Sequence, residues 1–191
     1  MKEIFLLSSL LLVACISQAQ KGKFTLSAGT TNNVATFYDQ DNADKLKITL
    51  TGTIPIHVEA GYYLSDKFQL ALSYNRSSYT SDELDLSSLG YGKVSWESVY
   101  SSYMLKANYF YINTEKFKLG SGIGLGTLVQ DANYKQTGGT LKAPESESKS
   151  GFSIHLNILD ARYFFAKNIG VYATGGFVKQ GIWGLGVIGR F

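Results

Sequence analysis

Residues 98–130 read SVYSSYMLKANYFYINTEKFKLGSGIGLGTLVQ, and this stretch decides the fold. In its first half apolar and polar residues alternate, which is the period of a β-strand with two different faces. The apolar face carries Val99, Tyr103, Leu105, Ala107, Tyr109 and Tyr111, and the polar face carries Ser98, Ser102, Lys106 and Asn108. After the short polar link 113–116, aliphatic residues alternate with the glycines at 120, 122, 124 and 126. The stretch predicts two long strands joined by a tight turn.

The same period recurs over most of the chain of 191 residues, and 20 Gly, 11 Phe and 13 Tyr with only two Pro suit an all-β protein. We predict eight strands, at 23–31, 53–64, 67–79, 94–112, 117–130, 151–165, 170–179 and 182–191. No interior segment approaches the ~20 apolar residues of a membrane-spanning helix. Alternation alone does not separate a soluble sandwich from a membrane barrel, because both contain two-faced strands.

The lengths of the links favour the barrel. The links after the second, fourth and sixth strands are tight, at 65–66, 113–116 and 166–168. The links after the first, third and fifth strands are long and polar, at about 32–52, 80–93 and 131–150, and the last link, near 179–181, is short. Tight turns on one side and long loops on the other are typical of an eight-stranded antiparallel up-and-down transmembrane β-barrel.

Aromatic residues gather near both ends of the predicted strands. Near the tight turns lie Tyr62, Tyr63, Phe68, Tyr109, Tyr111, Phe117, Tyr163, Phe165 and Phe191. Near the other end lie Tyr74, Tyr79, Trp96, Phe152, Phe177 and Trp183. Two aromatic girdles with aliphatic residues between them fit a bilayer with two interfaces. The core of a soluble sandwich predicts no clustering at both strand ends.

The first segment is predicted to be an export signal. Residues 1–19 combine a short charged start, a long apolar run and the ending Ser17-Gln18-Ala19, the pattern of a cleaved signal peptide. The barrel domain would then comprise residues 20–191. The alternative is a lipobox ending at Cys15, which would become a lipidated N-terminus. One Cys excludes a disulfide framework, and a net charge of +3 is too low to argue for nucleic acid.

The last predicted strand carries a resemblance to a known family. It reads WGLGVIGRF at 183–191, with Gly184 and Gly186 on one face and apolar residues on the other. With its eight strands and this terminal strand, the mature chain resembles the small outer-membrane β-barrels of the OmpA and OmpX type. The resemblance implies a place in the cell outer membrane and contact with its lipid and lipopolysaccharide. We expect a monomer, although the residues themselves leave the oligomeric state open. The resemblance also implies recognition by the barrel-assembly machinery through Trp183, Leu185, Val187 and Phe191.

The same strand matches the dinucleotide-binding pattern G-x-G-x-x-G at 184–189. That pattern needs a helix after it, whose N-terminus receives the pyrophosphate, and no helix is predicted there. We therefore expect no cofactor.

Ionisable residues on the polar strand faces are the candidate functional residues, because these faces would line the lumen. They are His57, Glu59, Lys106, His155 and Arg190, joined by Asp160 and Arg162 if the sixth strand has a bulge near Ile158-Leu159. A charge inside a narrow barrel is costly unless it is paired. We therefore expect a network of salt bridges and hydrogen bonds that plugs the lumen. The alternative is a narrow channel, widened by the alternating glycines and lined by the charges.

A third possibility is an enzyme that modifies lipid A. A deacylase would need adjacent His and Ser residues on the lipid-facing wall. Both histidines fall on polar faces and no Ser–His pair follows from the spacing, so we predict no enzymatic activity. The long outer loops on a rigid barrel offer a surface for a ligand. We predict a structural or cell-surface interaction role, with the channel as the alternative and the enzyme third.

Overall fold

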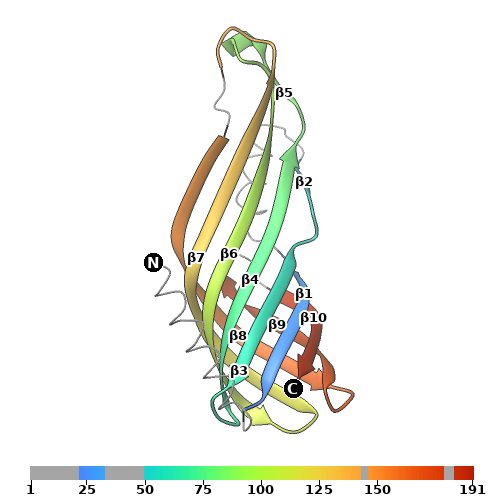
Figure 1. Cartoon of the computed structure of the whole chain (residues 1–191). Helices are drawn as coiled ribbons and strands as arrows, with labels where there is room; N and C mark the ends of the chain where they lie inside the picture. The colour runs from blue at the N-terminus through green and yellow to red at the C-terminus, as the bar shows by residue number, and fades with distance from the viewer. Residues whose placement is uncertain (1–21, 33–49, 143–145, 179–182) are drawn as a thin grey trace, which may run out of the picture.

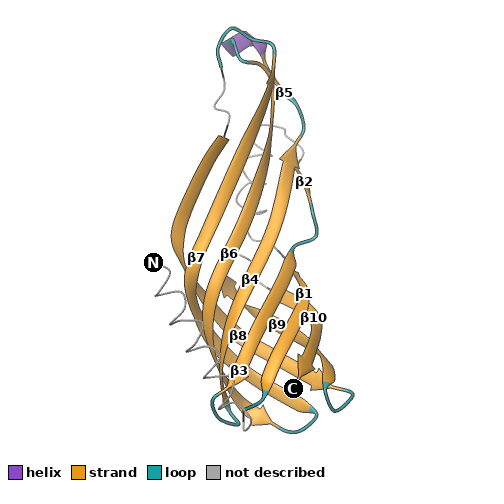
Figure 2. Cartoon of the chain, viewed as in Figure 1, coloured by secondary structure: helices purple, strands orange, loops and turns teal. Residues whose placement is uncertain are grey.

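The structure, a computed structural model, describes residues 22–32, 50–142, 146–178 and 183–191. Within them lie β1 Phe24–Thr31, β2 Leu50–Gly52, β3 Ile56–Tyr63, β4 Phe68–Ser81, β5 Leu84–Leu86, a 3-10 turn Ser87–Leu89, β6 Gly92–Asn113, β7 Phe117–Thr137, β8 Ser146–Phe164, β9 Ile169–Val178 and β10 Trp183–Arg190 (Figure 2). All eight predicted strands are present, whereas the short β2 and β5 were not predicted. None of the helices in the described ranges is both long and apolar enough to cross a membrane.

Several sequence predictions lie outside the described residues. These are the signal peptide at 1–19 with the alternative lipidation of Cys15, most of the first long link, and the short link near 179–181.

The eight long strands close into a ring. Each pairs antiparallel with the next long strand along the chain, from β1–β3 to β9–β10. The pairing of β1 with β10, from Thr25↔Arg190 to Thr31↔Gly184, completes the circle. The short β2 and β5 extend the sheet beside β4 and β6. The predicted eight-stranded antiparallel up-and-down barrel is confirmed.

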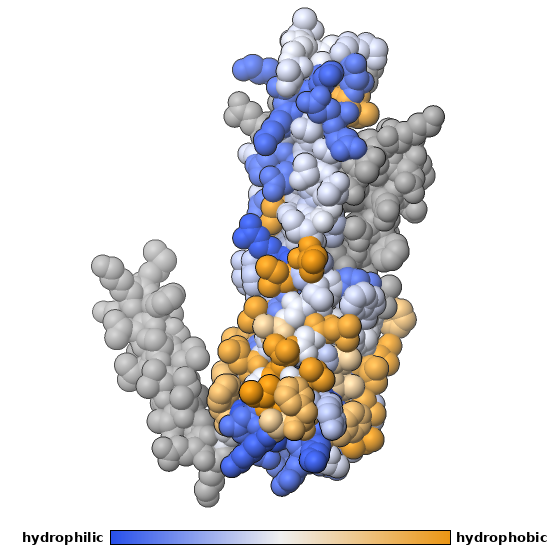
Figure 3. All heavy atoms as spheres, turned by 90° about the vertical axis from the view of Figure 1, so that its right-hand side faces the viewer, coloured by the Kyte–Doolittle hydropathy of each residue, from blue (hydrophilic) through white to orange (hydrophobic). Residues whose placement is uncertain are grey.

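An apolar belt surrounds the barrel near its tight turns, and in Figure 3 it forms the orange band above a blue lower rim. Its exposed aliphatic residues include Leu72, Leu105, Leu125, Ile154, Val171, Leu185 and Val187. Aromatic residues mark its two edges, with Tyr109, Tyr163, Phe165 and Phe191 at the turn end and Tyr103, Phe152, Phe177 and Trp183 at the other. The belt therefore has the composition expected of a wall in contact with lipid.

Three residues expected in these girdles lie elsewhere. Tyr63 and Tyr79 are both 4% exposed, and they point to the inner face together with Trp96. The prediction considered only their position along a strand. Because side chains alternate between the two faces of a strand, these three residues fall on the polar face. Tyr63, for example, lies on the same side of β3 as Glu59.

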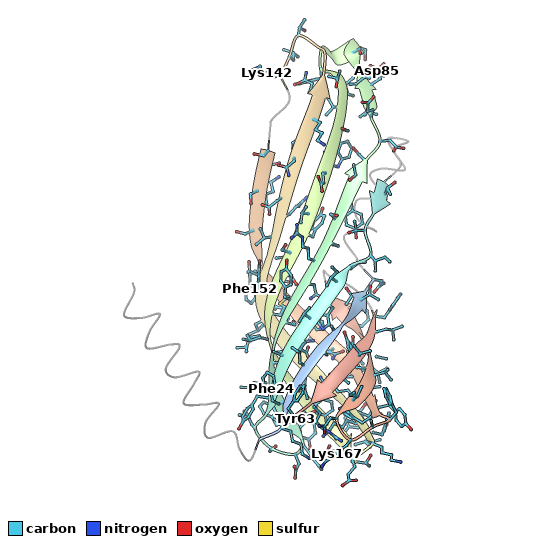
Figure 4. The ribbon with its side chains drawn as sticks, turned by 45° about the vertical axis from the view of Figure 1, so that its right-hand side comes forward. Phe24, Tyr63, Asp85, Lys142, Phe152 and Lys167 are labelled. Atoms are coloured by element: carbon cyan, nitrogen blue, oxygen red, sulfur yellow. The ribbon has the colours of Figure 1, made fainter. Side chains whose placement is uncertain are left out.

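The barrel wall is uneven in height (Figure 1). On β6 the belt ends at Tyr103, yet the strand continues for another eleven residues to Gly92. In Figure 4, Phe152 lies at mid-height, at the edge of the belt, and Asp85 and Lys142 lie near the far tip. We call this extension the projecting sheet; it comprises β2, β5 and residues 75–81, 92–102, 128–137 and 146–151.

The projecting sheet corrects two predicted loops. Segments 80–93 and 131–150 were expected to be long loops, but the β6–β7 ladder runs without a break in this region as far as Lys93↔Thr137. Most of these residues are Ser, Thr, Lys, Gln and other polar types, which made the segments look like loops. A polar strand persists when neighbouring strands satisfy its backbone N–H and C=O groups.

The tip of the projecting sheet is tied together by hydrogen bonds. The Gln136 amide donates to the carbonyl oxygens of Tyr91 (2.7 Å) and Gly138 (3.0 Å). The backbone N–H groups of Thr140 and Leu141 donate to the Gly90 carbonyl at 2.8 and 2.9 Å. Gly90 has φ +85°, a left-handed conformation that favours glycine. These bonds connect the β5–β6 and β7–β8 links.

Candidate functional site

Four charged side chains meet inside the barrel and form what we call the ionic cluster. The Lys106 ammonium donates to Glu59 Oε2 at 2.6 Å, and Arg162 Nη2 donates to Glu59 Oε1 at 3.2 Å. Arg162 also donates to both oxygens of Asp160, each at 2.7 Å. All four residues are at most 5% exposed. Two carboxylates and two cations therefore balance each other where water is largely excluded.

A β-bulge brings Asp160 and Arg162 into this cluster. On β7, Gly122 pairs with Asn157 but Gly120 pairs with Asp160, so β8 contains one extra residue there. Ile158 and Leu159 consequently both point outward, with 57% and 43% of their surfaces exposed. The predicted bulge is confirmed. Without the extra residue, strand alternation would turn Asp160 and Arg162 toward lipid.

Both histidines lie on the inner face. His57 is 6% exposed, its Nδ1 lies 2.6 Å from Asn75 Oδ1, and its Nε2 lies 4.0 Å from Glu59 Oε2. His155 is half-buried, and its Nδ1 has no hydrogen-bond partner among the described residues. Neither ring reaches the lipid-facing wall, so neither meets the geometry that a lipid A deacylase would need.

Arg190 does not join the ionic cluster, which corrects the sequence prediction. Its guanidinium donates to the Lys167 carbonyl at 3.1 and 2.6 Å and to the Glu115 carbonyl at 3.0 Å. Its Cζ lies 4.2 Å from the centre of the Phe164 ring. Arg190 sits at the turn end of β10, where backbone carbonyls of two tight turns are the acceptors within reach. It therefore ties these turns together.

Further polar residues, not predicted as site residues from the sequence, lie between the ionic cluster and the turn end. Gln69 donates to Thr25 Oγ1 at 2.8 Å, and Asn108 donates to Gln69 Oε1 at 3.2 Å. Lys118, 2% exposed, bonds to Asn113, and its Nζ lies 4.5 Å from the centre of the Tyr63 ring. The alternation along the strand could have identified Lys118, because Lys118 lies on the same face of β7 as its glycines.

The alternating glycines of β7 lie opposite large side chains inside the barrel. A Cβ on Gly122 would lie 2.1 Å from Asn108 Oδ1, and one on Gly124 would lie 3.0 Å from Lys106 Cγ. A Cβ on Gly120 would lie 2.8 Å from Phe110 Cδ1, and Phe110 is fully buried. The space opposite each glycine is therefore occupied by a large neighbour on β6.

The residues predicted to guide assembly form an outward row on β10. Trp183, Leu185 and Val187 are 48%, 50% and 58% exposed. Phe191 is 72% exposed, and its backbone N–H donates to the Phe24 carbonyl at 2.9 Å. The row is continuous with the apolar belt.

Among the described residues, the outer part of β8 forms an open edge of the projecting sheet. The pairing of β8 with β9 begins only at His155↔Val178. Residues 146–154 therefore pair, within the described chain, with β7 alone. Residues 146–152 are all exposed.

Comparison with known proteins agrees with this architecture. Ail, the attachment invasion locus protein of Yersinia pestis, crystallised in complex with the heparin analogue sucrose octasulfate, is 16% identical, with a TM-score of 0.55 over 89% of this chain and 99% of that one. A major outer membrane protein from Thermus thermophilus is 14% identical, with a TM-score of 0.58 over the same shares. No curated protein sequence matches.

The model of a protein family described as outer membrane protein beta-barrel domain matches residues 4–182, which is most of the chain. The closed antiparallel ring, the apolar belt with its aromatic edges and the polar interior are the features that such a domain requires. The chain therefore belongs to the outer membrane protein beta-barrel domain family and resides in the outer membrane.

Proposed function

We propose that this protein is a plugged outer-membrane anchor that presents the projecting sheet at the cell surface for interaction with a partner. The main support for the proposal is the distance by which this sheet extends beyond the apolar belt. Eleven residues of β6 beyond Tyr103 correspond to roughly 35 Å of extended chain. The tight turns lie at the opposite end, so the sheet extends on the loop side, which faces outward in barrels of this type.

Two features of the projecting sheet support a role in recognition. Its tip is tied by the bonds of Gln136 and Gly90, so it presents a fixed surface. Residues 146–151, which pair only with β7 among the residues that the structure describes, offer backbone groups to which an extended segment of a partner could add as a further strand. Ail has a similar fold, and its description as an attachment protein is consistent with the proposal.

The lumen favours a plug over a channel. The ionic cluster, the Gln69–Asn108 pair and Lys118 are buried inside the barrel at successive positions along the ladders, and the β7 glycines leave space for neighbouring side chains. We infer that the unmodified barrel has no steady ion conductance. We also infer that it has no lipid A-modifying activity, because both histidines point away from lipid.

A register-matched truncation tests the proposed function. Arg76 pairs with Ser101 and Leu128 pairs with Gly151, so residues 77–100 and 129–150 can each be replaced by an Asn-Gly turn without a change of register. This short-hairpin variant keeps the belt and the ionic cluster. Cells that make either protein would be tested for adhesion to surfaces coated with protein, heparin or mixed neutral glycans.

We expect adhesion by the wild type that the short-hairpin variant lacks at equal surface abundance. Equal adhesion by the two proteins on every surface would contradict the proposal. Planar-bilayer recordings on the purified wild type test the plug, and a sizeable steady conductance would favour the channel instead.

A further inference from the structure

A hollow of about 300 Å³ opens on the inner face of the projecting sheet. Its lining residues are Trp96, Ser98, Gln130, Ala132, Tyr134, Glu147 and Lys149. They come from β6, β7 and β8, which run side by side above the belt (Figure 1). The hollow is separate from the ionic cluster, and it includes Trp96, a residue predicted from the sequence to belong to an aromatic girdle.

The strand register brings these side chains together. Trp96 pairs directly with Tyr134, which places two half-buried aromatic side chains next to each other. One step toward the barrel on the same face, Ser98 pairs with Ala132. These two small residues are 4% and 6% exposed and leave space between the larger ones. The hollow is therefore a shallow depression with aromatic side chains at its outer end.

The β8 side of the hollow is polar. Glu147 pairs with Ala132, and Lys149 pairs with Gln130. The Lys149 ammonium and the Glu147 carboxylate lie 2.9 Å apart, and their side chains are 68% and 47% exposed. The hollow thus has donors and acceptors but no net charge.

Two further polar groups in the hollow are available to a ligand. Neither the indole N–H of Trp96 nor the side-chain amide of Gln130 bonds to another group within the described residues. An indole N–H only donates, whereas an amide both donates and accepts. A ligand that fits must therefore offer an apolar face to the rings and groups of both kinds to its polar side.

We propose that this hollow binds a neutral saccharide, one terminal sugar unit of a surface glycan. A pyranose ring has an apolar C–H face that packs on an aromatic side chain and a rim of hydroxyls that donate and accept. The volume lies at the lower limit of small-molecule pockets, which suits a single sugar unit and not a long chain. The proposal rests on the proposed function, since the site lies on the projecting sheet.

Other ligand classes fit the hollow less well. A sulfated or phosphorylated ligand would contact the Glu147 carboxylate as well as the Lys149 ammonium, and the like negative charges would repel each other. An acyl chain would cover Glu147 and Gln130 without giving them hydrogen bonds, at a cost in free energy. A partner strand would add at the open edge of β8 and would not need the two aromatic side chains on β6 and β7.

The first test is a glycan microarray that carries neutral, sialylated and sulfated glycans, probed with the full-length protein in detergent. We expect binding to a subset of neutral glycans that Trp96→Ala and Gln130→Ala each weaken at least about tenfold, as for an aromatic anchor and its polar partner. Lys135→Ala is the matched control, because Lys135 is exposed on the opposite face of the same sheet. Heat-modifiable migration on gels shows whether each variant is folded.

The second test uses fluorescence. The chain has two tryptophans, and Trp183 lies on the lipid-facing wall, so Trp183→Phe leaves Trp96 as the sole indole reporter. Saturable change in Trp96 emission on titration with a neutral oligosaccharide chosen from the array would support the proposal. This readout does not depend on the folding of a Trp96 variant.

Binding only to sulfated or sialylated glycans would overturn the proposal, as would binding that Gln130→Ala leaves unchanged or no binding to any neutral glycan. These results are distinguishable from failure of the proposed function. Adhesion that is lost in the short-hairpin variant but kept in Gln130→Ala would retain the projecting sheet as the interaction surface and reject the saccharide site.

Discussion

The ionic cluster makes a quantitative prediction for Glu59→Gln. The substitution keeps the volume of the side chain but removes a charge that accepts hydrogen bonds from both Lys106 (2.6 Å) and Arg162 (3.2 Å). Two buried cations are then left with the single carboxylate of Asp160. Breaking a buried ion pair costs about 3–5 kcal/mol. Two charge-assisted hydrogen bonds, at about 1.5–3 kcal/mol each, give a similar range.

We therefore expect Glu59→Gln to lower the free energy of unfolding by about 3–5 kcal/mol. The assay is reversible urea unfolding of barrel refolded into phospholipid vesicles, followed by tryptophan fluorescence, with an unchanged m-value as the sign that stability alone has changed. Glu97→Gln, the same change at an exposed position of the projecting sheet, is the control and should shift stability by less than about 0.5 kcal/mol.

Combining Glu59→Gln with Lys106→Met restores charge balance, so the double variant should lose less stability than the sum of the two single changes. A Glu59→Gln barrel as stable as the Glu97→Gln control, or strict additivity in the double variant, would refute the plug as a coupled ionic network.

Three further predictions concern assembly, packing and the tip. Phe191→Asp should reduce the amount of folded barrel in the outer membrane while export continues, as measured by heat-modifiable migration of fractionated protein; normal abundance would argue against its role in assembly. Gly122→Ala should destabilise the barrel by about 1–3 kcal/mol because the added Cβ meets Asn108, and an unchanged urea midpoint would show that the lumen has spare room. The Ser87 hydroxyl and N–H donate to Asp85 and hold the pKa of its carboxyl below the ordinary value, so this turn should stay ordered as pH falls until the lowered pKa is reached. Ser87→Ala should raise the pKa of Asp85 in an NMR titration, and no change would exclude this contact in solution.

The sequence was sufficient to predict the barrel because the membrane imposes a simple rule on it. One face of every strand must be apolar, so the period of two identified all eight long strands and the inward direction of Glu59 and Lys106. Even the bulge in β8 was visible, since Ile158 and Leu159 interrupt the alternation.

The requirement for one apolar strand face does not apply to residues beyond the apolar belt. In segments 80–93 and 131–150 both faces are in contact with water or with other polar groups, so strand and loop have the same composition. The period of two also predicts which face of the strand a residue lies on, but not its position along the barrel axis. Arg190 faces inward as predicted, but its position at the end of β10 places its guanidinium beside the carbonyls of the turns, and it bonds to them and not to Glu59. Partners within the lumen could be assigned only from the register.

Several strands are longer than is needed to cross the membrane, and the extra length forms the projecting sheet. A tilted strand needs about 9–11 residues to cross the hydrocarbon region. β1, β3 and β10 have 8 residues each and β9 has 10, whereas β6 has 22 and β7 has 21. Ordering each additional residue costs about 1–2 kcal/mol of backbone entropy, which ladder bonds and side-chain contacts must offset.

The contacts that offset this cost lie on the inner face of the projecting sheet. Tyr79 and Tyr100 are buried, with ring centres 6.0 Å apart in an edge-to-face arrangement. The Ser81 hydroxyl accepts a hydrogen bond from the Trp96 backbone N–H at 2.9 Å and so holds β4 against β6 near the rim of the hollow. These contacts stiffen the part of the sheet that presents Trp96 and Tyr134. The extra length thus forms a fixed surface outside the membrane, which is where a recognition function requires it.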